Sequence, residues 1–284
     1  MTTASPAHNP GDLDAQMERY WDTHPPRSDR RLAWRITVIV EVILLLVLVQ
    51  VAVGSLRLID EAFFPAPISV GESIANLVTG NSFLKDLSFS ITNYVIGVTL
   101  ACVVGIGLGL AIGMSSLMDL TVKPFVWAFY AVPKVAIAPL LILILGLGAP
   151  SKIAMVFLLS LFPVLINTMD GVRTVDPTLL RAGAVYGFRG WRLARAVILP
   201  ATIPFILVGV RRAIALGFIG EILGEFLGSV QGLGVRLQSA VAAFQMADAI
   251  AVVVLMVIAA NIGLWIMDRI QRIVAPWSLD AARS

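Results

Sequence analysis

The chain has 284 residues, of which 58% are hydrophobic and 14% are charged, with a formal net charge of +3. Its mean hydropathy of +0.89 is too high for a water-soluble domain, so the composition predicts an integral membrane protein with one transmembrane domain. The basic excess does not indicate nucleic-acid binding, because the cytosolic loops of membrane proteins are rich in Lys and Arg. Cys102 is the single cysteine, which excludes a disulfide within the chain.

The first 34 residues are polar and contain four prolines and both histidines. We expect residues 1–34 to form a cytosolic tail, residues 35–275 the transmembrane domain, and residues 276–284 a second cytosolic tail. The tail is not predicted to be a secretory signal, because acidic residues precede the first apolar run and that run is long enough to span. Both histidines lie in the tail, which argues against a histidine-based metal site or general base within the membrane.

Six apolar stretches predict six transmembrane helices, because lipid offers no hydrogen-bond partners to an open backbone. The predicted spans are residues 36–54, 91–113, 125–147, 152–169, 203–223 and 249–267. With the N-terminus inside, 14 of the 21 Lys and Arg residues are cytosolic, 4 (Lys152 among them) are outside and 3 lie within spans. This asymmetry predicts that both termini face the cytosol. The predicted fold class is an all-α integral membrane protein.

The second span contains Gly105, Gly107, Gly109 and Gly113, a pattern that could suggest a nucleotide-binding loop. No predicted strand precedes these glycines, and apolar residues surround them. Gly105, Gly109 and Gly113 share one helix face at a spacing of four residues, which favours close packing against a neighbouring helix. That neighbour could belong to this chain or to a second copy.

The third span contains Pro133, Lys134 and Pro139. A proline removes a backbone donor, so the span should be kinked or locally unwound. Broken helices can line a substrate path, where freed backbone groups are hydrated. The alternative is a simple packing kink, with the lysine reaching along its own stem to the membrane interface.

The fifth span contains Arg211, Arg212, Glu221 and Glu225. Adjacent residues point about 100° apart on a helix, so the two arginines cannot both face one cavity. Burial in hydrocarbon is costly, and at least one arginine should therefore face a polar cavity or a carboxylate. Alternatively, both lie near the cytosolic boundary. Glu225 is expected at the outer end of the span, before a glycine-rich turn.

Between the fourth and fifth spans lies a basic loop, residues 171–200. Asp176 and Pro177 predict a helix start, as N-cap and first helical residue, and the helix should run from Thr178 to about Tyr186. Gly187 can end it in the left-handed conformation.

A second short helix is expected over residues 190–198, stopping at Leu199 and Pro200. Ala182, Gly183 and Ala184 would leave one side of the first helix slim enough for a groove of another protein. The alternative is an amphipathic helix that lies on the membrane without a partner.

The spacing from Arg181 through Gly187 to Leu199-Pro200 resembles the cytosolic EAA loop of ABC-importer permeases. Other features occur in the order of the binding-protein-dependent permease family, in particular the branch that imports nitrate, taurine and alkanesulfonates: Pro67, Ser90 with Gly97, Gly105-x-Gly-x-Gly, Pro133 with Pro139-Leu140, Gly146-x-Gly148, Gly209 with Arg211, Glu225, Gly232-Leu233-Gly234, Asp248 and Pro276-Trp277.

The resemblance implies a type I ABC importer permease fold with cytosolic coupling helices, in the inner membrane of a prokaryote. The chain would pair with a second copy, as a homodimer, or with a close relative. Two ABC ATPase subunits would dock on the paired loops and hold the ATP and Mg, and an extracytoplasmic binding protein would deliver a small solute. This chain itself would bind no cofactor and catalyse no reaction.

On this basis two groups of site residues are predicted, with no catalytic and no metal-binding residue. The ATPase-coupling group comprises Arg181, Ala182, Gly183, Tyr186, Gly187, Leu199 and Pro200. The translocation-pathway group comprises Asn93, Lys134, Pro139, Arg211 and Glu225. The chain departs from the family pattern where Arg181 replaces a Glu and Gly183 an Ala, and where Asn93 and Tyr130 occupy positions that often hold Arg.

Two other classes of protein compete with this interpretation. A membrane-embedded enzyme would require paired carboxylates, a histidine-rich metal site or an activated serine at membrane depth, and the sequence displays none of these. An ion-coupled secondary carrier is disfavoured because the six predicted spans show no internal repeat.

Overall fold

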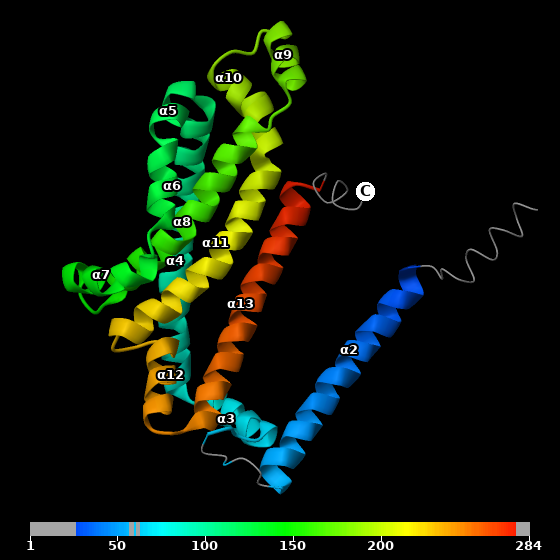
Figure 1. Cartoon of the computed structure of the whole chain (residues 1–284), viewed down its shortest axis with the longest axis vertical. Helices are drawn as coiled ribbons and strands as arrows, with labels where there is room; N and C mark the ends of the chain where they lie inside the picture. The colour runs from blue at the N-terminus through cyan, green and yellow to red at the C-terminus, as the bar shows by residue number, and fades with distance from the viewer. Residues whose placement is uncertain (1–26, 57–59, 61–62, 277–284) are drawn as a thin grey trace, which may run out of the picture. The chain divides into compact units, whose positions relative to one another are not determined.

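The computed structural model describes residues 27–56, 60 and 63–276, and its described residues contain helices but no strand (Figure 1). Most of the predicted N-terminal tail and nearly all of the predicted C-terminal tail lie outside this part. The chain forms two compact units, residues 1–68 and 69–284.

The first unit contains α2 (Arg27–Gln50), which continues into a π-helical turn, η1 (Val51–Ser55). Residues 36–55 of this helix are long and apolar enough to cross a membrane, which confirms the first predicted span. Glu41 is exposed on it.

The second unit consists of helices in the following order along the chain: α3 (Pro67–Thr79, which begins at the boundary), α4 (Asn81–Met114), α5 (Ser116–Thr121), α6 (Lys123–Ala131), the 3-10 turn η2 (Lys134–Ile137), α7 (Ala138–Leu145), α8 (Ala149–Arg173), α9 (Pro177–Val185), α10 (Trp191–Leu193), the π-helical turn η3 (Ala194–Ile198), α11 (Leu199–Gly228), α12 (Leu233–Ala242) and α13 (Met246–Val274). The short helices α5, α9 and α10 lie at one end of this unit, and α12 lies toward the other (Figure 1).

Four helices of the second unit are long and apolar enough to span a membrane: Ser82–Met114, Ala149–Arg173, Trp191–Gly228 and Met246–Val274. Each contains one predicted span and extends beyond it. The helices are longer because their polar ends continue the backbone hydrogen bonding past the hydrocarbon core, a continuation that an apolar run cannot reveal.

The third predicted span is bent rather than straight. Its two helical pieces, Lys123–Ala131 and Lys134–Leu145, meet at an angle of 77°. Pro133 supplies no backbone N–H, and Val132 before it is extended, with φ −63° and ψ 129°, as residues before proline prefer. The predicted break is therefore confirmed.

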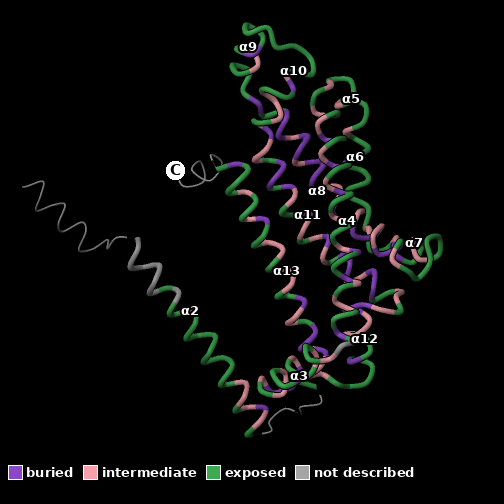
Figure 2. Tube along the Cα trace, turned by 180° about the vertical axis from the view of Figure 1, so that it is seen from behind, coloured by how far each residue is buried: buried purple, intermediate pink, exposed green. Residues whose placement is uncertain are grey.

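Close packing of α8 between α4 and α11 forms the centre of the second unit. Buried positions occur along most of α8 (Figure 2). Glycines on α4 face it: a Cβ atom added to Gly105, Gly109 or Gly113 would lie 2.9, 2.6 or 2.7 Å from the Cβ atom of Val164, Thr168 or Val172. The predicted packing role of this glycine face is confirmed, and the neighbour belongs to the same chain.

Glycines of α11 face α8 from the other side. A Cβ atom on Gly209 would lie 2.9 Å from the Pro163 carbonyl oxygen, and one on Gly220 would lie 3.2 Å from the Val156 Cα atom. Ser160 adds a polar contact by donating its hydroxyl proton to the Ala213 carbonyl oxygen at 3.0 Å. The backbones of three helices are therefore in close contact without large side chains between them.

Lys152 corrects one expectation. The sequence counts it among the residues outside the membrane, but it lies in the first turn of α8 and is 0% exposed. Its ammonium donates to the Leu147 carbonyl oxygen at 2.7 Å, to the Ser151 hydroxyl at 3.2 Å and to the Gly228 carbonyl oxygen. The turn after α7, the end of α11 and Ser151 thus supply the acceptors that water would otherwise provide.

The α4–α8 contact can be tested by Gly109→Leu. Because even a Cβ atom would lie 2.8 Å from the Leu165 carbonyl oxygen, the helices must separate to admit the side chain. Overpacking of this kind costs about 1–3 kcal/mol, and the thermal unfolding midpoint of the detergent-solubilised complex should fall.

Gly107→Leu is the matched control, since nothing lies within 4 Å of a Cβ atom at Gly107 on the same helix. Equal midpoints for the two variants would show that the α4 glycine face is not a packing surface.

Candidate functional site

The basic loop between α8 and α11 begins with a well-capped helix, α9. The side chain of Asp176 accepts a hydrogen bond from the Thr178 N–H at 2.7 Å, and Pro177 occupies the first helical position. At the other end Gly187 has φ +78°. Its N–H donates to the Ala184 carbonyl oxygen at 3.0 Å, and the next N–H, of Phe188, donates to the Gly183 carbonyl oxygen at 2.9 Å. This is a Schellman motif, and it confirms both predicted helix ends.

The second half of the loop differs from the prediction. A helix begins at Trp191 as expected, but it does not stop at Leu199 and Pro200. It passes through the π-helical turn η3 into α11 and continues to Gly228. Pro200 directly follows η3, where the Leu199 N–H donates to the Ala194 carbonyl oxygen, and this local π-helical widening accommodates the proline within a continuous helix.

The faces of α9 also differ from the prediction. Arg181, Ala182 and Ala184 are exposed, but Gly183 is buried. A Cβ atom at Gly183 would lie 2.7 Å from the Leu193 Cδ1 atom and 3.2 Å from the Val197 Cγ2 atom. Gly183 therefore allows α9 to pack on the following helix and does not provide a slim outer face.

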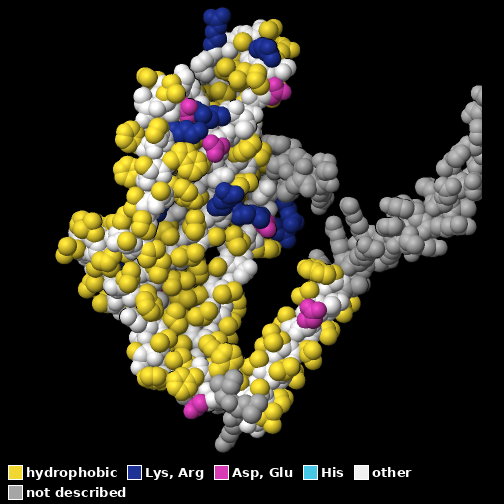
Figure 3. Space-filling model, in the orientation of Figure 1, with side chains coloured by type: hydrophobic (Ala, Val, Ile, Leu, Met, Phe, Trp, Pro, Cys, Tyr) yellow, Lys and Arg dark blue, Asp and Glu magenta, His cyan; other side chains and the backbone are white. Residues whose placement is uncertain are grey.

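The tip of the loop exposes large apolar side chains. Val185 is 86% exposed, Tyr186 80% and Trp191 73%. A groove beside them is lined by Leu179, Ala182, Tyr186, Phe188, Val197 and Pro200. Figure 3 shows Lys and Arg side chains among hydrophobic ones at this end of the molecule. An exposed apolar patch beside basic residues is typical of a surface that contacts another protein or a membrane.

An ion pair that the sequence did not reveal supports the start of the loop. Arg173, in the last turn of α8, pairs with Asp119 of α5. In the sequence, Asp119 falls in the short connection between the second and third predicted spans. The hydropathy pattern places this connection at the same end of the molecule as Arg173. The pair could therefore have been found by matching opposite charges at the same predicted membrane face.

The predicted pathway residues near the broken span surround the break itself. The ammonium of Lys134 donates to the Tyr130 carbonyl oxygen at 2.7 Å and to the Val132 carbonyl oxygen at 3.3 Å, and lies 4.6 Å from the centroid of the Phe162 ring. It thus caps the carbonyl end of α6, where the helix stops. Pro139 lies in the first turn of α7.

Arg211 forms an ion pair with Asp268, which joins α11 to α13. One of the two adjacent arginines therefore meets a carboxylate, as expected. Arg212 makes no ion pair with any residue that the structure describes. Both arginines line a groove between the two helices together with Asn261 and Trp265.

Glu225 lies near the far end of α11 and is 1% exposed. Its carboxylate accepts hydrogen bonds from the Ser90 hydroxyl at 2.6 Å and from the Gly234 N–H at 2.7 Å. Gly232 has φ +123°, and a Cβ atom there would overlap the carboxylate, so only glycine fits this turn.

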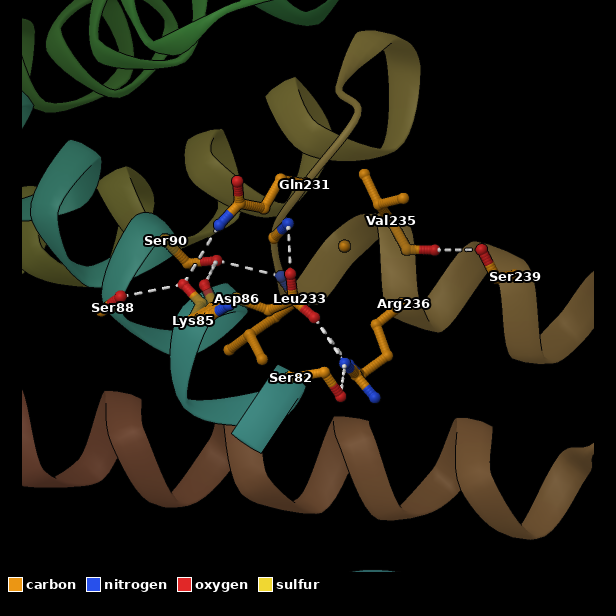
Figure 4. A network of polar contacts seen from close by, with 12 residues as sticks. Ser82, Lys85, Asp86, Ser88, Ser90, Gln231, Leu233, Val235, Arg236 and Ser239 are labelled. Carbon is orange, nitrogen blue, oxygen red and sulfur yellow. Dashed lines mark hydrogen bonds and ion pairs between the residues drawn. The ribbon is translucent and has the colours of Figure 1, made fainter. Parts of the chain in front are cut away.

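Further polar contacts join the same turn to α4 (Figure 4). The Ser90 hydroxyl accepts from the Leu233 N–H at 3.0 Å, and Asp86 pairs with Arg236 at 2.6 Å. Sequence reasoning noted Ser90 as part of a motif but missed this network, because its partners are about 140 residues apart in the chain.

The predicted pathway residues therefore do not form one site in this chain. Asn93, which is 2% exposed, lies near Glu225 in one buried cluster, Lys134 and Pro139 flank the break between α6 and α7, and Arg211 lies in the α11–α13 groove. Among the described residues, no group of three or more His, Cys, Asp and Glu side chains could hold a metal ion.

Comparisons with known proteins agree with this geometry. A family model described as "Binding-protein-dependent transport system inner membrane component" matches residues 103–279. A putative aliphatic sulfonates transport permease protein, SsuC of Bacillus subtilis, is 31% identical over 188 residues, which are 66% of this chain and 68% of the relative. The taurine transport system permease protein TauC of Escherichia coli is 29% identical over 262 residues, covering 87% and 94% of the two chains.

The formylaminopyrimidine transport permease protein ThiX of Halalkalibacterium halodurans is 28% identical over 224 residues, covering 78% of this chain and 89% of the relative. The matched family region includes α8, α11 and the loop of residues 171–200, and these relatives are transport permeases rather than enzymes. The chain therefore belongs to the binding-protein-dependent ABC transporter permeases, as a multi-pass inner-membrane component of a transport system that also uses an ATPase and a substrate-binding protein.

Proposed function

We propose that this chain is the transmembrane subunit of an ATP-driven type I importer, which moves a small solute from an extracytoplasmic binding protein into the cytosol by alternating access. The observation that carries the proposal is the loop of residues 171–200. It is rigidly capped at Asp176 and Gly187 and presents an exposed apolar tip with basic neighbours. Such a surface suits the docking of an ATPase subunit.

In this proposal the loop faces the cytosol, and so do both termini. Residues 1–34, 35–275 and 276–284 are the N-terminal tail, the permease domain and the C-terminal tail. Two copies of the chain form a homodimer, and one ATPase subunit docks on each loop. The exposed residues Arg181, Ala182 and Tyr186 contact the ATPase, while Gly183 and Gly187 shape the loop and Leu199 and Pro200 connect it to α11.

We propose a sulfonate, taurine, nitrate or a similar small solute as the substrate. Support comes from the relatives named for aliphatic sulfonates and for taurine. The groove between α11 and α13 contains two arginines and one aspartate, so it has a net positive charge that suits an anionic group. Arg211 would exchange its bond to Asp268 for a transient bond to the solute.

The remaining pathway candidates contribute in different ways. Lys134 and Pro139 would line the path through the backbone groups at the break between α6 and α7, and Asn93 and Glu225 would lie near its outer end. Because Lys134 is bonded to carbonyl oxygens and Glu225 to Ser90 and Gly234, each would affect the path mainly by fixing the helices around it.

The docking surface can be tested by Val185→Asp. A buried carboxylate without a partner would weaken an apolar contact, so the inserted permease should retain much less ATPase during purification. Val230→Asp is the matched control, because Val230 is 80% exposed but lies at the other end of α11. Equal ATPase retention by the two variants would contradict the assignment of the docking surface.

Gly183→Trp should also reduce ATPase retention, but through a different cause. The new side chain would collide with Leu193 and Val197 and unfold the packing within the loop. Limited proteolysis should therefore cleave the loop of this variant at its arginines faster than the loop of Val185→Asp. Equal cleavage rates would show that Gly183 has no packing role.

The pathway role of Arg211 is tested by uptake into vesicles that contain the reconstituted complex. Arg211→Ala should slow uptake of an anionic solute about tenfold, the loss expected for one charge-assisted hydrogen bond, and Arg212→Ala should have a smaller effect. Basal ATP hydrolysis should continue in both variants, because neither residue is in the docking loop.

The double variant Arg211→Ala with Asp268→Asn separates two roles of Arg211. If Arg211 binds the solute, removal of the Asp268 charge will not restore uptake. Full restoration would show that Arg211 serves only to neutralise Asp268.

A further inference from the structure

A cluster of polar side chains is buried where α4, α8 and α11 meet, and it is not explained by docking or by the α11–α13 groove. It contains Lys152, Glu221, Glu225 and Asn93, which are 0%, 2%, 1% and 2% exposed. Ionised groups are rarely buried to this extent unless each has a partner, because the protein interior solvates charge poorly. The partners of each group therefore decide what the cluster can hold.

Two of the groups are satisfied. The ammonium of Lys152 has three N–H donors, and these are directed at the Leu147 and Gly228 carbonyl oxygens and at the Ser151 hydroxyl. The carboxylate of Glu225 accepts from the Ser90 hydroxyl and from the Gly234 N–H. Lys152 thus has no N–H left for a carboxylate, and both carboxylate oxygens of Glu225 have a hydrogen-bond donor.

The other two groups are not satisfied. Among the described residues, neither carboxylate oxygen of Glu221 has a hydrogen-bond partner, and neither does the amide nitrogen of Asn93. The electrostatic neighbours of Glu221 are Glu225, Asn93 and Lys152. The Asn93 amide lies beside Glu221 but makes no well-formed hydrogen bond to either carboxyl oxygen, so Glu221 is a buried carboxyl group with another carboxyl group beside it and no satisfied oxygen.

The charges do not balance within the cluster. Glu221 and Glu225 contribute two negative charges when both are ionised, and Lys152 contributes one positive charge. The adjacent Asp86 and Arg236 neutralise each other, and the Tyr94 hydroxyl is occupied by the Ile214 carbonyl oxygen. One positive charge is therefore missing at a place where an uncompensated charge is strongly unfavourable.

We infer that Glu221, with Glu225 and Asn93 beside it, binds one monovalent cation, either a proton or an alkali ion. Two carboxyl groups that share a buried site commonly hold one proton between them. A proton on Glu221 would balance the charge and would also create the O–H donor that the pair lacks. An alkali ion would balance the same charge by using the two unpartnered oxygens of Glu221 as ligands.

The bound cation also affects the turn of residues 229–234, which leads into α12. Glu225 accepts a hydrogen bond from the Gly234 N–H at the end of the turn of residues 229–234. Ser90 accepts one from the Leu233 N–H of the same turn (Figure 4). The bound cation removes the repulsion that an ionised Glu221 would exert on Glu225. It thereby keeps Glu225 available for the turn.

Infrared spectroscopy of the purified permease–ATPase complex tests the proton. The wild type at neutral pH should show the carbonyl band of a protonated carboxyl group, and Glu221→Gln should lack that band. Glu72→Gln is the matched control, because Glu72 is exposed on α3 and its replacement should leave the band unchanged.

Thermal unfolding in sodium, potassium and choline chloride at equal ionic strength tests the alkali ion. If the cation is an alkali ion, the wild-type midpoint rises in sodium or potassium chloride and that rise is absent in Glu221→Gln. If the cation is a proton, the salts have equal effects and the band is present. The inference would be overturned if the wild type showed no carbonyl band that depends on Glu221 and also no stabilisation by sodium or potassium.

Folding and assembly of the Glu221→Gln variant also test the inference. Glutamine has the shape of a neutral glutamic acid and leaves Lys152 and Glu225 balanced, so Glu221→Gln should assemble with a midpoint within about 2 °C of the wild type. Failure of this variant to fold would also contradict the inference, because it would mean that the negative charge of Glu221 is required.

Discussion

Close contact between helix backbones is the constraint on which the second unit depends. Lipid tails are as apolar as the side chains they surround, so helices in a membrane associate through packing rather than through the hydrophobic effect. The glycines of α4 and α11 allow both helices to approach α8 until added Cβ atoms would collide. The positions of the 171–200 loop and of the buried polar cluster follow from this arrangement, because the loop joins α8 to α11 and the cluster contains residues of all three helices.

The same constraint determines how polar groups are accommodated. Every interruption of a helix frees backbone groups, and nearby side chains compensate for them. Lys134 caps the carbonyl end of α6 at the bend, Lys152 bonds to carbonyl oxygens at the ends of α7 and α11, and Glu225 bonds to the N–H of Gly234. Lys134 and Glu225, which the sequence suggests as parts of a solute path, are thus hydrogen-bonded to backbone groups at or near helix ends. Arg212 and Glu221 are different, since neither has a hydrogen-bond or ion-pair partner among the described residues, and they are the residues most available for ligands.

The sequence predicted the elements whose signals are local. Hydropathy located five spans and the bent helix pair where the third span was expected, Pro133 predicted the break, and Asp176 with Gly187 predicted both ends of α9. The sequence did not predict contacts between residues that are far apart in the chain. Nothing near Lys152 indicates that α7 and α11 supply its acceptors, and nothing near Gly183 indicates that Leu193 packs on it. The sequence predicts a helix stop at Leu199 and Pro200, yet the helix continues because a π-helical turn before Pro200 accommodates the missing donor. The pathway residues stay predictions, since they lie in three separate places in this chain.

The central claim is that the tip of the 171–200 loop is the surface on which the ATPase docks. It can be tested by cross-linking, because the chain has one cysteine, Cys102, which can first be replaced by alanine. A cysteine introduced by Tyr186→Cys should then form a cross-link to the ATPase subunit of the assembled transporter, and substrate-stimulated ATP hydrolysis should fall once it has formed. The claim would be contradicted if Tyr186→Cys gave no cross-link while Val230→Cys, at the other end of α11, gave one.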